Sequence, residues 1–281
     1  MGLYRWVLSG IVGSAAALLS CSGGPAPPTP GTLPFYWAAA QETFKTGDYI
    51  KTGDHLDQLT RSENEFTARA APWRLILLAG LGRGYMDIAE RFDQGVRANK
   101  TNPGPLRKRL LEYRSMASRY QLQFAEAFEK FQKTQTQGDV TLALPFPRGS
   151  PAPVAALNRV AEGAVLPTPE LESAQTQALQ RAVLLEVCRA AGAKDDAARA
   201  SEILKTPPVQ LPRPTFLFAM AESFSEGATL FGPRKLAQPD RLEYFNNRAL
   251  DVLKGLPDSP QVKALKEKVQ EESKKSKSGR S

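Results

Sequence analysis

A single histidine, His55, is the side chain best suited to acid–base or metal chemistry near neutral pH. Asp54 and Asp57 lie beside it and could supply carboxylate ligands to half of a metal site. One histidine cannot build a metal site with several imidazole ligands. By itself it also does not make a serine triad or a histidine–cysteine pair. Because acidic residues beside a histidine are common on protein surfaces, we predict no catalytic residue, no metal and no cofactor.

The N-terminal segment has the order of a signal peptide: the positive charge of Arg5, the apolar stretch 6–20, and then Cys21. Fifteen helical residues rise only about 22 Å, less than the ~30 Å hydrocarbon core, so this stretch suits cleavage better than spanning. The run Leu-Leu-Ser-Cys at 18–21 resembles the lipobox of bacterial lipoproteins. That resemblance implies removal of residues 1–20 and a diacylglycerol on Cys21. The alternative is an uncleaved N-terminal helix, because Arg5 is the only charge before the apolar stretch.

Residues 21–33 are rich in proline and glycine and predict a flexible tether, because proline lacks an amide donor and glycine is conformationally free. Several acyl chains on Cys21, at ~0.8 kcal/mol per buried methylene, would give stable membrane anchoring. The localisation expected is the bacterial cell envelope, facing the periplasm. Ser22 follows the cysteine, and its resemblance to enterobacterial sorting signals implies the outer rather than the inner membrane.

Cys188 is the second cysteine, and its context is that of a core residue. It falls with Ala182 and Leu185 on the apolar face of an expected helix at 169–191. With Cys21 lipidated, no second thiol remains for a disulfide. We expect a buried free thiol without a redox role.

The run Glu222-Ser223-Phe224 resembles the segment that carries the catalytic acid of lytic transglycosylases, which would imply peptidoglycan cleavage by Glu222. That family also needs a Gly-Leu-Met-Gln run and a downstream Tyr-Asn-x-Gly segment. Here Ser225-Glu226-Gly227 follows, and the run at 244–247, Tyr-Phe-Asn-Asn, lacks the glycine. A single carboxyl without its supporting residues is not a site, so a lytic enzyme is the weaker alternative.

The body of the chain reads as all-α. Its composition, 42% apolar and 23% charged, is that of a folded protein. Apolar residues recur at intervals of three and four positions, as in helices, rather than at every second position, as in strands. We predict N-terminal helical hairpins over 34–144, an irregular proline-rich boundary at 145–153, a C-terminal helical half over 150–270 and a basic flexible tail at 271–281. Helices are expected near 34–46, 48–60, 105–133, 151–163, 169–191, 194–205, 214–231, 239–255 and 259–275.

The run Gly-Asp-Tyr-Ile-Lys at 47–51 resembles the turn between the two helices of a tetratricopeptide repeat. Aligned on that turn, Tyr36, Ala39 and Ala40 take packing positions in the first helix, and Thr52, Leu56 and Leu59 take those of the second. A weaker copy begins at Trp73, with its turn near Gly84. Repeats of this kind bury their apolar faces by stacking, so the resemblance implies a right-handed solenoid of helical hairpins. Any antiparallel helical hairpin is the alternative.

The expected helix 105–133 carries a single apolar stripe, which consists of Leu106, Leu110, Tyr113, Ala117, Tyr120, Phe124, Phe128 and Phe131. The spacings of three and four place these side chains on one helix face. A groove for a partner helix is one interpretation, and a buried core is the one we favour.

The chain carries a formal net charge of +8, and its basic residues concentrate in one region. Between positions 97 and 119 seven basic residues face one acid, Glu112. Those expected to form an anionic-partner patch are Arg107, Lys108, Arg109, Arg114 and Arg119. Their targets could be lipid headgroups, glycan-linked phosphate or an acidic protein, with a plain solvated helix face as the alternative. No stacking aromatics or known motif accompany them, so nucleic acid is not expected.

Together these features predict a non-catalytic, membrane-anchored envelope lipoprotein that acts as a scaffold for other envelope proteins. A first alternative is an accessory lipoprotein of a solute transporter or of an outer-membrane assembly complex. A second is the peptidoglycan lytic enzyme acting through Glu222.

Overall fold

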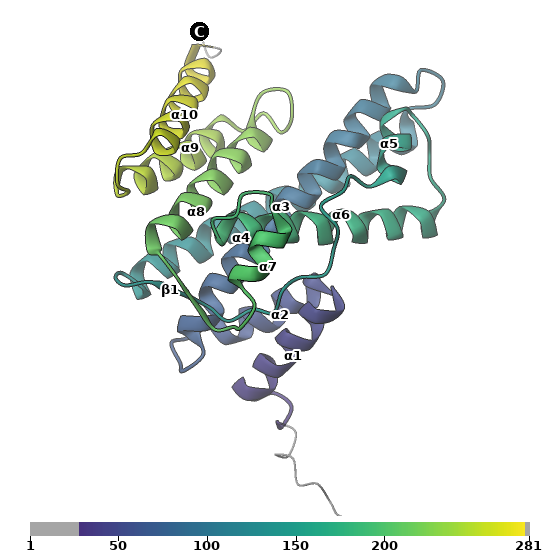
Figure 1. The fold of residues 1–281 in the computed structure, drawn as a ribbon. Coiled ribbons are helices and arrows are strands. Elements are labelled where there is room, and N and C mark those ends of the chain that lie inside the picture. The colour runs from purple at the N-terminus through teal and green to yellow at the C-terminus, as the bar shows by residue number, and fades with distance from the viewer. Residues whose placement is uncertain (1–27, 279–281) are drawn as a thin grey trace, which may run out of the picture.

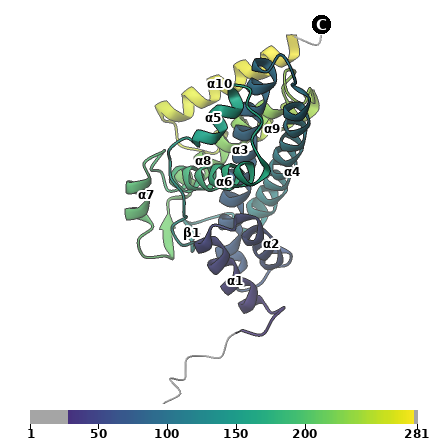
Figure 2. The same cartoon turned by 90° about the vertical axis from the view of Figure 1, so that its right-hand side faces the viewer.

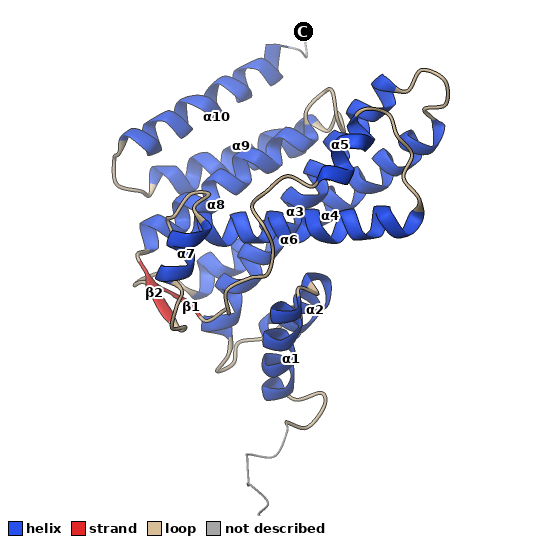
Figure 3. Cartoon of the chain, turned by 45° about the vertical axis from the view of Figure 1, so that its right-hand side comes forward, coloured by secondary structure: helices blue, strands red, loops and turns tan. Residues whose placement is uncertain are grey.

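The computed structural model describes residues 28–278, so the expected signal peptide, Cys21 and most of the expected tether lie outside the described residues. Within this range the chain forms ten α-helices, and the predicted all-α class is confirmed (Figures 1 and 3). The helices are α1 (Leu33–Thr46), α2 (Tyr49–Thr60), α3 (Thr67–Ala98), α4 (Gly104–Thr134), α5 (Ala155–Ala161), α6 (Thr168–Ala190), α7 (Ala197–Ile203), α8 (Arg213–Ala228), α9 (Pro239–Lys254) and α10 (Pro260–Ser278). A search of the described helices for one long and apolar enough to cross a bilayer finds none.

Helices α1 and α2 form the first hairpin that the sequence predicts. The Thr32 hydroxyl accepts a hydrogen bond from the Phe35 amide at 3.4 Å, and α1 ends at Gly47 in the left-handed conformation, φ 83°. Asp48 caps α2 by accepting a hydrogen bond from the Lys51 amide at 3.2 Å. The residues predicted for the core of α2 are buried, namely Thr52, Leu56 and Leu59.

Helix α3 is continuous, so the second tetratricopeptide-like hairpin predicted around Gly84 is wrong. A glycine inside a helix lowers its stability by ~1 kcal/mol relative to alanine. When no packing partner is known, a turn is therefore the simpler interpretation of such a glycine. In the fold, the missing side chains let α6 come close to α3. A Cβ added at Gly80 would lie 2.8 Å from the Cα of Val183, and one at Gly84 would lie 2.9 Å from Cδ2 of Leu179. The glycines therefore serve a close helix crossing.

Helix α4 folds back along α3. Tyr85 stacks on Tyr120 with ring centroids 5.5 Å apart, and the ring centroids of Phe92 and Tyr113 lie 5.1 Å apart. The later residue of α3 thus meets the earlier residue of α4, so the two helices are antiparallel. All eight residues of the apolar stripe predicted on this helix are buried. The interpretation of the stripe as core is confirmed.

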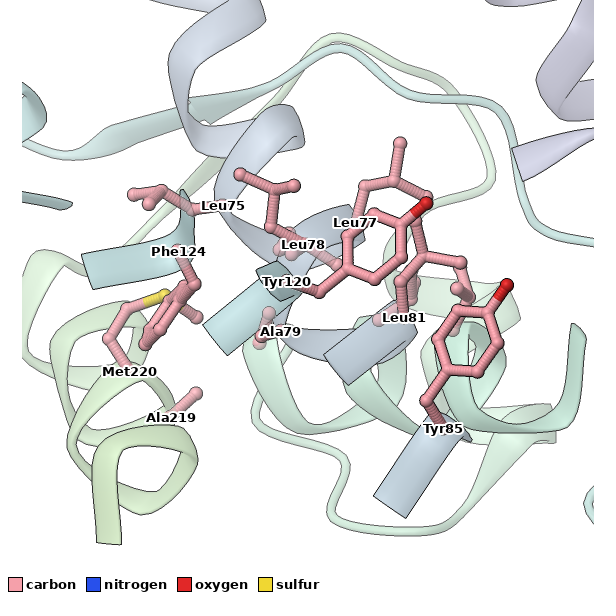
Figure 4. Packing of buried hydrophobic residues seen from close by; sticks show 14 of the residues in the cluster. Leu75, Leu77, Leu78, Ala79, Leu81, Tyr85, Tyr120, Phe124, Ala219 and Met220 are labelled. Atoms are coloured by element: carbon pink, nitrogen blue, oxygen red, sulfur yellow. The ribbon is translucent and has the colours of Figure 1, made fainter. Parts of the chain in front are cut away.

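Helix α8 packs on α4 and completes the centre of the molecule. The rings of Phe124 and Phe224 lie 4.7 Å apart, and Phe224 lies 5.6 Å from Phe245 of α9. Figure 4 shows Phe124 beside Met220 and Ala219 of α8, with Leu75 of α3 on the other side of its ring. Side chains from helices far apart in the sequence thus share one core.

Two short strands, β1 (Val140–Leu142) and β2 (Val209–Leu211), pair antiparallel, with Thr141 opposite Gln210. No strand is predicted from the sequence, because three residues are too few for an alternating pattern to stand out. Residues 143–154 carry neither helix nor strand, as expected from their prolines. Helix α5 is shorter than the predicted 151–163, because prolines occupy positions 151 and 153.

Helices α9 and α10 lie at the end of the molecule opposite α1 (Figures 1 and 2). A buried face on α9, formed by Leu242, Phe245 and Ala249, joins it to the core. Helix α10 continues to Ser278 through the start of the segment predicted as a flexible tail, where the structure has helix instead.

Candidate functional site

A groove of about 790 Å³ lies between α8 and α10 and forms the candidate site. Helix α8 supplies Phe218 and Glu222 to its lining, and α10 supplies Leu265 and Lys268. The chain that follows α6 also lines it, through Gly192, Lys194 and Asp195. The groove therefore offers apolar surface together with charges of both signs.

The turn between α9 and α10 orients the wall that α10 provides. The Ser259 hydroxyl accepts a hydrogen bond from the Val262 amide at 3.2 Å and caps the start of α10. Val262 and Val269 are buried against the rest of the molecule, while Leu265 between them is half-buried. One face of α10 thus holds it in place and a neighbouring face borders the groove.

Arg189 of α6 organises the charges on the α8 side of the groove. Its guanidinium donates to both carboxylate oxygens of Glu226, at 2.8 and 3.0 Å. Arg189 Nε lies 3.6 Å from Glu222 Oε2, and Nη1 lies 3.4 Å from Glu186 Oε2. Burial alone would lower the pKa of Arg189, but its three carboxylates outweigh burial and raise that pKa. One fixed cation is therefore shared by three carboxyl groups, and Arg83 lies 3.9 Å from one of them, Glu226.

Glu186 is the most deeply placed acid of this cluster, with 1% of its surface exposed. The Ser223 hydroxyl donates a hydrogen bond to it at 2.5 Å. Burial raises the pKa of Glu186, and the attraction of Arg189 and the bond from Ser223 only partly oppose this. The arrangement joins α6 to α8 from inside the protein.

Glu222, the residue of the lytic-enzyme alternative, lies in the groove with 33% of its side chain exposed. Burial raises its pKa, and Arg189 acts in the opposite direction. A carboxyl with a raised pKa can hold a proton for acid catalysis, whereas a neighbouring guanidinium stabilises the ionised form. Asp195 is the other carboxylate that lines this groove.

His55 does not gather the carboxylates that flank it in the sequence. Its ring lies beside that of Tyr36, with centroids 6.1 Å apart. Asp57 instead pairs with Arg74 at 2.6 Å and with Arg61 at 3.2 Å. Across residues 28–278 no group of three or more His, Cys, Asp or Glu side chains is placed to hold a metal ion. His55 therefore lies on the surface of the α1–α2 hairpin, beside an aromatic ring.

Cys188 is fully buried in α6, as predicted. Burial, with a smaller contribution from Asp195 and Asp196, raises the pKa of its thiol to about 11. A thiol that stays protonated at neutral pH is a poor nucleophile. Cys188 acts as a small apolar residue of the core.

The predicted anionic-partner patch divides into two groups. Arg114 has only 13% of its side chain exposed, lies 3.3 Å from Asp93 of α3 and donates to the Lys235 carbonyl. Arg109 pairs with Glu112 at 2.8 Å. Arg107, Lys108 and Arg119 are exposed and take part in none of the ion pairs found among the described residues. Asp93 was missed because it reaches the patch from the neighbouring helix.

The role of Arg189 was not predicted from the sequence. A signal existed, because Glu186 and Arg189, like Glu222 and Glu226, share a helix face by their spacing. Spacing does not reveal that the two faces meet. No family model matches this chain, and no curated protein or solved structure is significantly similar to it.

Proposed function

We propose that this chain is a non-catalytic lipoprotein of the bacterial envelope that binds other envelope proteins through its helical surface. The observation that carries the binding role is the groove between α8 and α10. Phe218 and Leu265 give it apolar surface, while Lys194 and Lys268 add positive charge. Apolar surface with a few charges that fix orientation is typical of a site that recognises a protein segment.

The geometry of the two ends is compatible with an anchor at Cys21. The first described residues lead into α1, and the groove lies at the opposite end, beside α10 (Figures 1 and 2). A lipid on Cys21 would therefore hold the α1 end toward the membrane and leave the groove open to the periplasm. The right-handed solenoid of hairpins belongs to the same proposal, supported by the antiparallel pairs α1–α2 and α3–α4.

The anchor is tested by labelling bacteria that express the full chain with a clickable fatty acid. We expect label on the wild type, and we expect Cys21→Ala to lose the label and to leave the membrane fraction. Cys188→Ala is the matched control and should keep both. Label on Cys21→Ala, or wild type in the cytosol, would overturn the anchored lipoprotein.

The binding role is tested by placing the photo-crosslinking residue p-benzoylphenylalanine at Leu265 in the groove, or at Glu202 on α7 as a control. The Glu202 side chain is 76% exposed, so both probes meet solvent. We expect a discrete adduct from position 265 and none from position 202 in intact cells. The same adducts from both positions, or none from position 265, would contradict the groove as a partner site.

The identity of the crosslinked partner separates the scaffold from the accessory alternative. A component of a solute transporter or of an outer-membrane assembly complex in the adduct would assign the chain to that machinery. Adducts with several unrelated envelope proteins would favour the general scaffold.

A second candidate is peptidoglycan cleavage through Glu222, which one observation favours: the carboxyl lies in a groove and burial raises its pKa. Its test is the release of soluble fragments from purified sacculi. The scaffold proposal expects no release by the wild type. Release that Glu222→Gln abolishes, and that the exposed control Asp251→Asn retains, would establish the enzyme instead.

A further inference from the structure

A second groove, of about 580 Å³, lies along the outer face of α4. Its α4 wall includes Leu111, Ser115, Arg119 and Leu122, and residues of the segment 236–241 form the opposite wall. The buried apolar stripe of α4 faces the core, so this wall is the other side of the same helix. The groove is separate from the site between α8 and α10.

Apolar side chains remain open to solvent in this groove. Leu111 is 60% exposed, the most of the three large apolar residues that are exposed among the described residues. Leu122 and Leu236 are half-buried and line the same groove. Covering such a strip removes apolar surface from water, which favours association with a partner that brings apolar side chains of its own.

Two arginines set the charge of the groove. Arg119 is exposed and forms none of the ion pairs found in the described part of the chain. Arg241 faces it from the other wall, held over the Phe231 ring at 5.9 Å and donating to the Ser118 hydroxyl at 3.3 Å. Glu126 is the one acid in the lining. The positive charge continues along α4 through Arg107 and Lys108.

The length of the groove favours a polypeptide over a small anion. From Leu111 to Glu126 the helix rises about 22 Å at 1.5 Å per residue. An extended segment of about seven residues spans the same distance at ~3.3 Å per residue. A phosphate or a single headgroup would fill only one point along it.

The position of the groove also argues against the membrane surface that the anchor would occupy. Trp37 of α1 contacts Trp73 near the start of α3, whereas Tyr113 of α4 contacts Phe92, about 28 Å farther along that helix. The α1 end leads toward Cys21, so the Leu111 end of the groove points away from the anchored end. This step rests on the proposed function.

We propose that this groove binds an acidic segment of a partner protein, whose carboxylates contact Arg119 and Arg241 and whose aliphatic side chains cover Leu111 and Leu122. Guanidinium groups recognise carboxylates through paired hydrogen bonds, and the leucines add affinity that charge alone does not give. Binding should weaken as salt rises, because both arginines border solvent.

The test selects peptides from a random library of 12 residues displayed on phage, with the purified full chain in detergent as bait. We expect enriched peptides that combine Asp or Glu with Leu, Ile or Val. Arg119→Glu and Leu111→Asp should each weaken them by tenfold or more, and both sites are exposed, so the fold should tolerate the changes. Lys205→Glu, an exposed cation beyond α7, is the matched control and should bind like the wild type.

Peptides without acids, peptides that bind Arg119→Glu as tightly as the wild type, or no enrichment would each overturn the inference. Vesicles of phosphatidylglycerol or phosphatidylcholine form a separate arm. Loss of phosphatidylglycerol binding in Arg119→Glu, with no peptide selected, would assign the groove to lipid and overturn it as well. The fatty-acid label on Cys21 is independent of these outcomes, so a failure of the groove and a failure of the anchor are distinguishable.

Discussion

Gly80 of α3 lies directly against the backbone of α6, where an added Cβ would be 2.8 Å from the Cα of Val183. Backbone atoms cannot rotate away as a side-chain tip can, so this contact fixes how closely the two helices approach. The same crossing brings Arg189 of α6 toward the acids of α8. The packing of α3 on α6 thus helps to fix the position of Arg189 at the candidate site.

Gly80→Ala should therefore destabilise the protein, although alanine is the better helix former. Overpacking typically costs ~1–3 kcal/mol, against a gain in helix propensity of ~1 kcal/mol. Gly53→Ala is the matched control, because its Cβ would meet only Leu77 Cδ2 at 3.8 Å. Urea unfolding followed by circular dichroism should give a lower midpoint for Gly80→Ala and an unchanged or higher one for Gly53→Ala. Equal midpoints would show that the crossing can relax.

Glu186→Gln should become more stable relative to the wild type as pH rises from 4 toward 8. Burial raises the pKa of Glu186 above the ordinary value of 4.5, so its stabilising contribution is complete below that value and is lost as pH rises through the folded pKa. The glutamine has no charge to bury. Unfolding free energies measured in urea at several pH values give the comparison, and a difference that does not vary with pH would contradict it.

Glu226→Gln should show the opposite pH dependence. Burial would raise the pKa of Glu226, but the attraction of Arg189 and its hydrogen bonds outweigh burial and lower it. Its contribution is present above 4.5 and is lost as pH falls through the folded pKa. The variant should be less stable than the wild type at pH 7, and the difference should shrink on acidification. The same urea series measures it, and a deficit that grows toward low pH would refute the ion pair.

Cys188 should resist alkylation in the native protein. It is fully buried, and the pKa of its thiol is raised to about 11, so little thiolate exists at pH 8. N-ethylmaleimide should react slowly in buffer and within minutes in guanidinium chloride, as mass spectrometry of the peptide that contains Cys188 can show. Rapid labelling of the folded protein would mean that α6 opens readily.

Tyr49→Phe should loosen the irregular segment 143–154. The Tyr49 hydroxyl donates to the Arg148 carbonyl at 2.8 Å, and one such hydrogen bond contributes ~1 kcal/mol. Trypsin should cut after Arg148 faster in this variant, with Tyr36→Phe as the control at a ring without this bond. Equal cleavage rates would show that the segment is held by other contacts.

Local signals in the sequence determined much of the helical layout. Gly47 and Asp48 mark the turn between α1 and α2. Apolar residues spaced three and four positions apart identify the buried face of α4. These signals are readable because capping and helical periodicity join residues no more than four positions apart. The burial of Cys188 followed from the same periodicity.

The tertiary structure alone decided the rest. Gly84 reads locally as a turn, and only the approach of α6 explains why α3 continues through it. Arg189 and Glu226 lie 37 positions apart, and Arg119 and Arg241 lie on different helices, so no local pattern pairs them. Close packing and ion pairing depend on which surfaces meet in space. The periodicity of a helix shows which of its faces is buried, but it does not show which other helix packs against that face.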